Sequence, residues 1–252
     1  MTNETVGIKT YESDKEKGLR RSLLESFKNC PIPEDQLLSN LGLFLNSKSL
    51  SRILFMDMIY RKIVDVQGIV LEFGTRWGQN MALFSSLRGI YEPFNRHRKI
   101  VAFDTFEGFP SLSDKDGKSD MMKQGNLALT DKYQAYLDNL LSLNEADGPL
   151  GHIKKNETVA GDACKNIVTF LEKHPQTIVA LAYFDFDLYE PTKKCLEAIK
   201  PHLTKGSIIG FDELNDPDSP GETIALREVF GLDKYSIKRP PITSRVSYLV
   251  VE

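Results

Sequence analysis

The spacing of the hydrophobic residues changes along the chain, close to Gly68. Before this glycine, apolar residues recur every three or four positions, as Leu19, Leu23 and Phe27 do, and such spacing predicts helices within 19–66. After it, continuous apolar runs alternate with helical spacing. A continuous run is typical of a strand buried on both faces, so this part of the chain predicts a parallel sheet covered by helices.

The alternation continues to the C-terminus. It predicts strands at 68–74, 99–104, 157–162, 177–187 and 206–213, then a hairpin of 235–240 with 245–252. We expect an α/β fold with a Rossmann-like, doubly wound, mostly parallel sheet of seven strands and a C-terminal antiparallel hairpin. Residues 1–66 are expected to be an N-terminal arm and helices, serving as a lid or for oligomerisation, and residues 67–252 the main domain. Residues 105–130 have no periodicity and predict a long loop.

Composition narrows the class of protein. With 41% hydrophobic and 27% charged residues, a disordered or fibrous chain is excluded. The net charge of −3 gives no reason to expect a nucleic acid as partner, and no apolar run is long enough to span a membrane. The polar N-terminus lacks the apolar core of a signal peptide, so a cytoplasmic location is expected. The three cysteines are scattered singly, which argues against a zinc ribbon or a disulfide framework.

Nearly every predicted strand ends in an acidic residue. In an open α/β sheet, ligands bind at the carboxyl ends of the strands, so these acids should face one crevice. Each acid could instead cap the helix that follows it. Taken together they favour a functional site, whose candidate residues are Glu72, Asp104, Asp162, Asp185, Asp187, Asp212 and Glu213.

The first predicted loop, LEFGTRWGQN, contains Gly74 and Gly78 between a buried strand and a helix. Glycines there let the backbone approach a ligand closely. The spacing is G-x-x-x-G, whereas a dinucleotide-binding loop requires G-x-G-x-x-G. Glu72 is a poor neighbour for a pyrophosphate and a good one for a cationic amino group. Glu72, Gly74, Thr75 and Gly78 are therefore candidates for cofactor binding, although a simple tight turn would also explain the glycines.

The acids at the later strand ends suit different partners. Asp104 can accept hydrogen bonds from both hydroxyls of a ribose, and Asp162 from an adenine amino group. Asp185 and Asp187 alternate, so if the strand continues only one faces the crevice, and we expect it to be Asp185. Asp185, Asp212 and Glu213 could together hold a hard divalent cation such as Mg²⁺, or could be solvated carboxylates paired with lysine and arginine.

Two segments carry a more specific signal, IVAFDTFEGFP and YFDFDLYEPTKKCLEAIKPHLTKGSIIGFDE. With the glycine loop, they resemble the macrocin O-methyltransferase family of class I S-adenosylmethionine-dependent methyltransferases, and within it the branch for rhamnose-type sugars of calicheamicin biosynthesis. The resemblance extends over roughly residues 40–252. It implies an enzyme that uses S-adenosylmethionine and Mg²⁺ to methylate a hydroxyl of a deoxysugar, either nucleotide-linked or part of a natural product.

The resemblance also assigns roles to residues. It implies that Glu72, Gly74 and Gly78 bind the methionine end of the cofactor, that Asp104 binds its ribose, and that Asp185 is both a metal ligand and the base. The family motif ends in two adjacent aspartates, whereas this chain has Phe211, Asp212 and Glu213, so the metal ligands depart from the family pattern. If the sugar is nucleotide-linked, candidates to meet its diphosphate are Arg52, Arg76 and Lys123.

Other functions stay open on the sequence alone. The same fold could methylate an amine or a phenolic hydroxyl. An NAD-dependent oxidoreductase fits the alternating strands and helices but not the glycine loop, and a non-catalytic scaffold that binds the cofactor is a third alternative. The apolar residues of the N-terminal helices also suggest that the protein forms a homo-oligomer.

Overall fold

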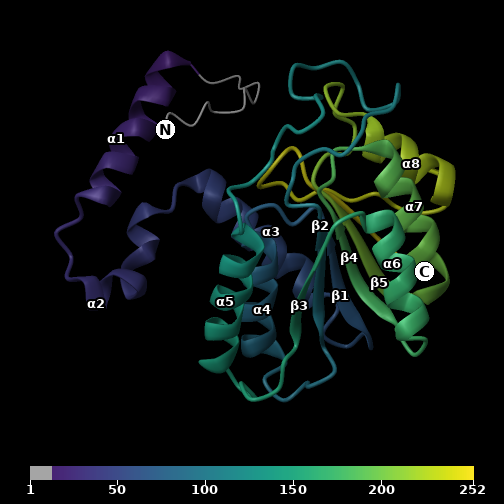
Figure 1. The fold of residues 1–252 in the computed structure, drawn as a ribbon, viewed down its shortest axis with the longest axis horizontal. Coiled ribbons are helices and arrows are strands. Elements are labelled where there is room, and N and C mark those ends of the chain that lie inside the picture. The colour runs from purple at the N-terminus through teal and green to yellow at the C-terminus, as the bar shows by residue number, and fades with distance from the viewer. Residues whose placement is uncertain (1–12) are drawn as a thin grey trace.

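The computed structural model describes residues 13–252, and its centre is a six-stranded sheet in the order β3-β2-β1-β4-β5-β6 (Figure 1). Five strands are parallel, and the last is antiparallel to β5. The strand order reverses between β1 and β4, which is where an open α/β sheet forms its ligand crevice. The strands are β1 (Ile69–Phe73), β2 (Ile100–Asp104), β3 (Asn156–Ala160), β4 (Val179–Phe184), β5 (Leu203–Phe211) and β6 (Ser247–Val250).

The prediction of seven strands is wrong by one. Residues 235–240 were expected to pair as a full strand of the closing hairpin, but only an isolated bridge joins Lys238 to Tyr248. Pro240 and Pro241 come two and three residues after Lys238. A proline cannot donate to a ladder, so the pairing ends there.

Helices cover both faces of the sheet and bury two hydrophobic clusters against it (Figure 1). On one face lie α3 (Ser47–Arg61), α4 (Gln79–Tyr91) and α5 (Tyr133–Ala146). On the other lie α6 (Ala163–Lys173), α7 (Tyr189–Ile199) and α8 (Gly221–Phe230). Because both faces are covered, the central strands β1, β2 and β4 are mainly apolar, as their continuous hydrophobic runs predicted, whereas the outer strand β3 (NETVA) is mostly polar.

Helix α3 is part of the core although it precedes residue 67. Phe55, Met56 and Ile59 are fully buried in the cluster that also contains residues of β1 and β4. Arg98, 1% exposed, pairs with Glu92 at 2.8 Å and donates to backbone carbonyl groups that follow α3. The division of the chain after residue 66 stays a prediction, but α3 itself is anchored to the sheet.

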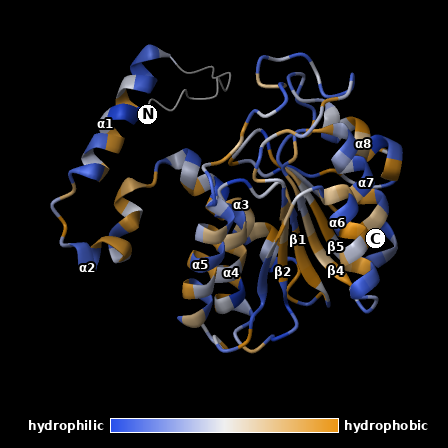
Figure 2. Cartoon of the chain, viewed as in Figure 1, coloured by the Kyte–Doolittle hydropathy of each residue, from blue (hydrophilic) through white to orange (hydrophobic). Residues whose placement is uncertain are grey.

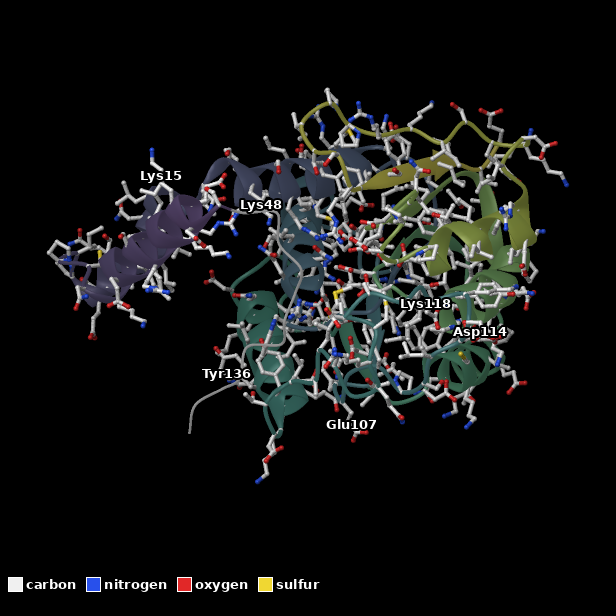
Figure 3. All side chains as sticks on the ribbon, turned by 90° about the horizontal axis from the view of Figure 1, so that it is seen from above. Lys15, Lys48, Glu107, Asp114, Lys118 and Tyr136 are labelled. Atoms are coloured by element: carbon white, nitrogen blue, oxygen red, sulfur yellow. The ribbon has the colours of Figure 1, made fainter. Side chains whose placement is uncertain are left out.

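Residues 13–45, called the arm below, extend away from the rest of the molecule in Figures 1 and 3. The arm contains α1 (Asp14–Lys28), α2 (Glu34–Leu37) and the 3-10 helix η1 (Leu38–Phe44). A capping box between Ser13 and Glu16 starts α1, so the helix begins earlier than the hydrophobic spacing predicted. What was expected of residues 1–12 lies outside the described residues.

Candidate active site

A cleft of about 820 Å³ opens at the carboxyl edge of the sheet. Loops that follow β1, β2, β3, β4 and β5 all contribute to its wall, as the acid-tipped strands predicted. Nine residues were assigned to the cofactor, the metal or the base, and six of them line the cleft, namely Gly74, Asp104, Asp162, Asp185, Asp212 and Glu213. Glu72, Thr75 and Gly78 are not among the lining residues; Glu72 is buried in β1, and Thr75 and Gly78 are buried in the loop that follows it.

The end of β1 and the loop after it hold several buried polar atoms without partners in the described residues. Glu72 is fully buried, and neither of its carboxylate oxygens has a hydrogen-bond partner within residues 13–252. Burial, and then the negative charge of Asp185, raise the pKa of the Glu72 carboxyl. Thr75 Oγ1 and Arg76 Nε are also buried without partners in that part of the chain. An acceptor beside two donors suits a ligand that carries both an ammonium and a carboxylate group.

The two glycines of this loop serve different packing contacts. Gly74 has φ of 88°, and a Cβ at this position would collide with the backbone carbonyl of Asp185. Gly78 has φ of 77°, and its Cβ would meet the side chain of Leu137 in α5. Gly74 thus lets the loops after β1 and β4 lie against each other, while Gly78 lets the loop lie against α5.

Asp104 and Asp162 line the cleft, and their carboxylates also accept hydrogen bonds from backbone N–H groups. The two carboxylate oxygens of Asp104 accept from the backbone N–H groups of Arg76, at 2.7 Å, and Phe106, at 2.6 Å. Asp162 caps α6, accepting from the backbone N–H of Cys164 at 3.0 Å. The capping alternative therefore describes Asp162 as the structure has it, and its contact with an adenine stays a prediction.

Asp185 lies beside an arginine that comes from α3. Arg52 is 2.6 Å from Asp212 and 3.7 Å from Asp185, measured between guanidinium nitrogens and carboxylate oxygens. Tyr183 donates its hydroxyl to Asp212 at 2.9 Å. Burial, and then the charge of Asp212, raise the pKa of the Asp185 carboxyl to about 8, against the opposing charge of Arg52. A carboxyl with such a pKa can exchange a proton near neutral pH.

The predicted metal ligands are paired with arginines. Asp212 pairs with Arg52, and Glu213 pairs with Arg245 and accepts a hydrogen bond from the hydroxyl of Ser219. Within the described residues, no group of three His, Cys, Asp or Glu side chains is arranged to hold a metal ion. As placed, the residues do not fit a magnesium site, and the alternative of paired carboxylates describes this arrangement.

The expectation that Asp187 turns away from the crevice is wrong, because β4 ends at Phe184 and strand alternation does not continue. Asp185 and Asp187 both line the cleft, and Asp187 has φ of 61°. Fully buried Glu222 accepts from the backbone N–H of Phe186 at 3.0 Å and holds this turn. Sequence reasoning missed Glu222, since it lies in the first turn of α8, where an acid is ordinary.

The three basic residues proposed to bind a diphosphate differ in whether they line the cleft and whether they are in an ion pair. Arg52 lines the cleft but is engaged with the carboxylates, and Lys123 is outside the cleft wall and pairs with Asp120 at 3.5 Å. Arg76 lines the cleft, next to Asp104. Of the three, Arg76 is thus the one that faces the cleft without an ion pair among residues 13–252.

The long loop 105–130 is fastened across this edge of the sheet. Asp116, 2% exposed, accepts from the backbone N–H of Tyr189, at the start of α7, at 2.5 Å. Lys115 pairs with Glu228 of α8 at 2.7 Å. Phe109 and Met122 form a small apolar cluster with Leu188. The loop has no helix or strand, as predicted, and its first part forms a wall of the cleft.

No described helix is long and apolar enough to cross a membrane. No family model matches the chain, and no curated protein matches it either.

Solved structures do match. A crystal structure of a calicheamicin methyltransferase is 43% identical, with 98% of this chain and 96% of that chain covered and a TM-score of 0.93. An apo structure of TDP-rhamnose 3'-O-methyltransferase, an enzyme in calicheamicin biosynthesis, is 40% identical, covers 96% of both chains and has a TM-score of 0.85. The O-methyltransferase NovP, 18% identical over 79% of both chains, has a TM-score of 0.56 and shares the fold.

Proposed function

The chain belongs to the family of O-methyltransferases that includes the calicheamicin methyltransferase, and from this premise we propose that it methylates a hydroxyl of a nucleotide-linked deoxysugar with S-adenosylmethionine. The membership rules out the oxidoreductase alternative. What supports the sugar as acceptor is that a relative 40% identical over 96% of both chains is a TDP-rhamnose methyltransferase.

The observation that carries the proposal is the position of Asp185 in the cleft. It lines the same cavity as Asp104, and the unpartnered atoms of Glu72, Thr75 and Arg76 lie in the loop beside it. A cofactor with its ribose at Asp104 and its amino-acid end at this loop would direct its sulfonium toward Asp185.

Three groups of the cofactor would each meet residues of the site: the ammonium, the carboxylate and the ribose. The Glu72 carboxylate would accept from the methionine ammonium, whose positive charge relieves the burial of that carboxylate. Thr75 and Arg76 would donate to the methionine carboxylate. Asp104 already accepts one hydrogen bond on each oxygen and has a further lone pair on each for the ribose hydroxyls. The bound cofactor supplies an electrophilic methyl group on sulfur.

Asp185 would act on the acceptor. A sugar hydroxyl has a pKa far above 7, so its oxygen needs a base that takes the proton as the new O–CH₃ bond forms. Asp185 can be that base because Arg52 and Arg245 favour its ionised form. Positive charge on the cofactor favours the same form, and holding the oxygen in line with the methyl group contributes several kcal/mol.

The variant Asp185→Asn tests the proposal. We expect turnover on a TDP-deoxysugar to fall by about 10²–10⁴-fold, while the affinity for S-adenosylhomocysteine in calorimetry stays within a few fold, because the amide cannot take the proton. A large loss of cofactor affinity would instead assign Asp185 to the cofactor site. Turnover on an amine or a phenol but on no sugar, or binding without turnover, would select the other acceptors or the scaffold alternative.

The magnesium ion stays a prediction, and no step above depends on it. Eight acidic residues line the cleft against four basic ones, so the site has an excess of negative charge that a cation would relieve. Because the residues as placed do not fit the ion, successive titration of EDTA and Mg²⁺ in one methyl-transfer assay decides: a rate that EDTA lowers and Mg²⁺ restores would show that the carboxylates rearrange to bind the metal. Equal rates in EDTA and in added Mg²⁺ would show that the reaction needs no metal ion.

A further inference from the structure

The diphosphate of the proposed acceptor still lacks a cation to bind it. Proteins recognise phosphate groups with arginine or lysine, and arginine donates several N–H groups in a fixed plane. Lys123 lies outside the cleft wall, and Arg76 would donate to the methionine carboxylate. Arg52 contacts the Tyr183 hydroxyl and two carboxylates, and its side chain is only 29% exposed. None of the three basic residues named from the sequence is therefore left for the diphosphate.

The order of the strands places the acceptor on the side of β5 and β6. The cofactor would lie over β1 and β2, with its ribose at Asp104 and its sulfonium toward Asp185 at the end of β4. The ends of β5 and β6 come next in the sheet, so they border the acceptor half of the cleft. Figure 2 shows β4 and β5 as hydrophobic strands, with hydrophilic stretches in the loops above them. A cation for the acceptor should come from these loops.

The pairing of β5 with β6 brings Arg245 to this position. Phe211 pairs with Ser247 in antiparallel register, and extending this register by two residues puts Arg245 opposite Glu213. The two side chains form an ion pair, and Arg245 is also 3.9 Å from Asp212. Backbone register thus predicts the same neighbours that the side chains have.

Glu213 holds Arg245 at the cleft without covering it. Glu213 is 3% exposed, and its second carboxylate oxygen accepts from the Ser219 hydroxyl. Arg245 lines the cleft with a side chain that is 54% exposed. Both of its ion-pair contacts within residues 13–252 use Nη2, which leaves the donors on Nε and Nη1 for a ligand. A guanidinium that is held at one end and open at the other suits phosphate oxygens.

The charges around Arg245 are compatible with an anion. Arg52 and Arg245 pair with Asp212 and Glu213, so these four groups balance one another. Burial and the charge of Asp212 raise the pKa of Asp185, and the charges of Arg52 and then Arg245 lower it, so Arg245 is near the base. In a nucleotide-linked sugar, only the sugar ring separates a ring hydroxyl from the diphosphate. A cation near the base is therefore placed to meet that diphosphate.

We propose that Arg245 binds the diphosphate of a nucleotide-linked acceptor and so selects nucleotide sugars over glycosides that have no phosphate, an inference that rests on the proposed function. Glu213 is then a positioning residue, because it fixes the guanidinium at the cleft. The diphosphate is not altered in the reaction, so this contact is made equally before and in the transition state. Its loss should therefore raise KM more than it lowers kcat.

Arg245→Met tests the proposal in a direct binding measurement. Titration of TDP (thymidine diphosphate) into protein saturated with S-adenosylhomocysteine, followed by calorimetry, should give a dissociation constant about 10–100-fold higher, because charge-assisted hydrogen bonds are lost. Arg245→Lys keeps the charge without the planar fork, so a smaller rise is expected. Arg239→Met is the matched control, since Arg239 is exposed in the same segment before β6 and should leave the constant unchanged.

Thymidine is the control ligand, because it has the base and no phosphate. Arg245→Met should bind it as the unmodified chain does. A TDP affinity that is the same in Arg245→Met and in the unmodified chain, or an equal loss for TDP and thymidine, would overturn the inference. An unchanged melting temperature verifies folding, and Arg245→Lys, which can keep the pair with Glu213, gives the same comparison if the methionine variant does not fold.

Steady-state kinetics separate this inference from the proposed function. For Arg245→Met, KM for a TDP-deoxysugar should rise by a factor similar to that of the dissociation constant, while KM for a methyl glycoside of the same sugar stays unchanged. Equal changes for both acceptors would overturn the inference and leave the proposed function in place. An unmodified chain that binds S-adenosylhomocysteine but neither binds TDP nor methylates a TDP-deoxysugar would overturn both.

Discussion

At the scale of single residues, the site depends on how carboxylates and guanidinium groups are shared. Arg52 contacts both Asp212 and Asp185, and Arg245 contacts Asp212 and Glu213. Both arginines favour the ionised form of Asp185, against its burial and the negative charge of Asp212, which raise its pKa. The consequence is a base whose ionisation is set by its neighbours.

The pH dependence of the reaction follows from this arrangement. Because the pKa of Asp185 is raised to about 8 in the free protein, the ionised fraction rises as the pH increases toward 8. We expect kcat/KM to rise up to about pH 8 and then level off, since this ratio reports the free enzyme. The kcat profile should lie at lower pH, because the bound sulfonium stabilises the carboxylate.

Arg52→Met provides the companion measurement. Removing the guanidinium raises the pKa of Asp185 further, so the rise in kcat/KM should move to higher pH by about one unit or more. Arg61→Met is the control, since Arg61 is on the exposed side of the same helix and pairs with Asp57. A profile that does not move in Arg52→Met would contradict the assignment of Asp185 as the base.

At the scale of elements, the sequence predicted the strands better than their ends. Continuous apolar runs located β1, β2, β4 and the second half of β5, because burial on both faces leaves a direct hydrophobic signal, while the short β3 was predicted from the alternation of strands and helices. The end of β4 at Phe184 was not predicted, because YFDFD alternates like a strand while Asp187 adopts a positive φ. Arg52 and Glu222 escaped assignment to the acid cluster for another reason: helices distant in sequence bring them there, and local spacing carries no such information.

Loop 105–130 gives a prediction at this scale. Asp116→Ala removes the acceptor of the Tyr189 and Ser113 backbone N–H groups and should cost about 1–3 kcal/mol. The loop would loosen, so we expect KM for the sugar to rise more than that for the cofactor, and proteolysis between 105 and 130 to become faster. Asp114→Ala is the matched control, because Asp114 is exposed in the same loop. It should leave stability, KM and proteolysis unchanged.

At the scale of the whole molecule, the buried side chain of Arg98 holds the segment between α3 and β1. Arg98 contacts Glu92 and the backbone carbonyl groups of Ile63, Val66 and Gly68. These bonds tie the segment that connects α3 to β1 to the segment that connects α4 to β2. The position of Arg52 in the cleft therefore depends on a contact made at the opposite edge of the sheet.

Arg98→Met should lower the free energy of unfolding by about 3–5 kcal/mol, because it leaves the carboxylate of Glu92 buried without its counter-ion. Arg96→Met, two residues earlier and exposed, should change it by less than about 0.5 kcal/mol. Urea titration followed by tryptophan fluorescence measures both. A loss below about 1 kcal/mol for Arg98→Met would show that the pair is not needed to hold α3.

The origin of Arg52 in α3 limits how this enzyme can be recombined with its relatives. A chimera joined at residue 67 would take its glycine loop and acidic strand ends from one parent and the arginine facing them from the other. Arg52, which balances the charge of the base, would then come from one parent, and the base Asp185 from the other. A chimera made to change the acceptor should have its junction before Asn46, so that α3 and the cleft residues come from the same parent.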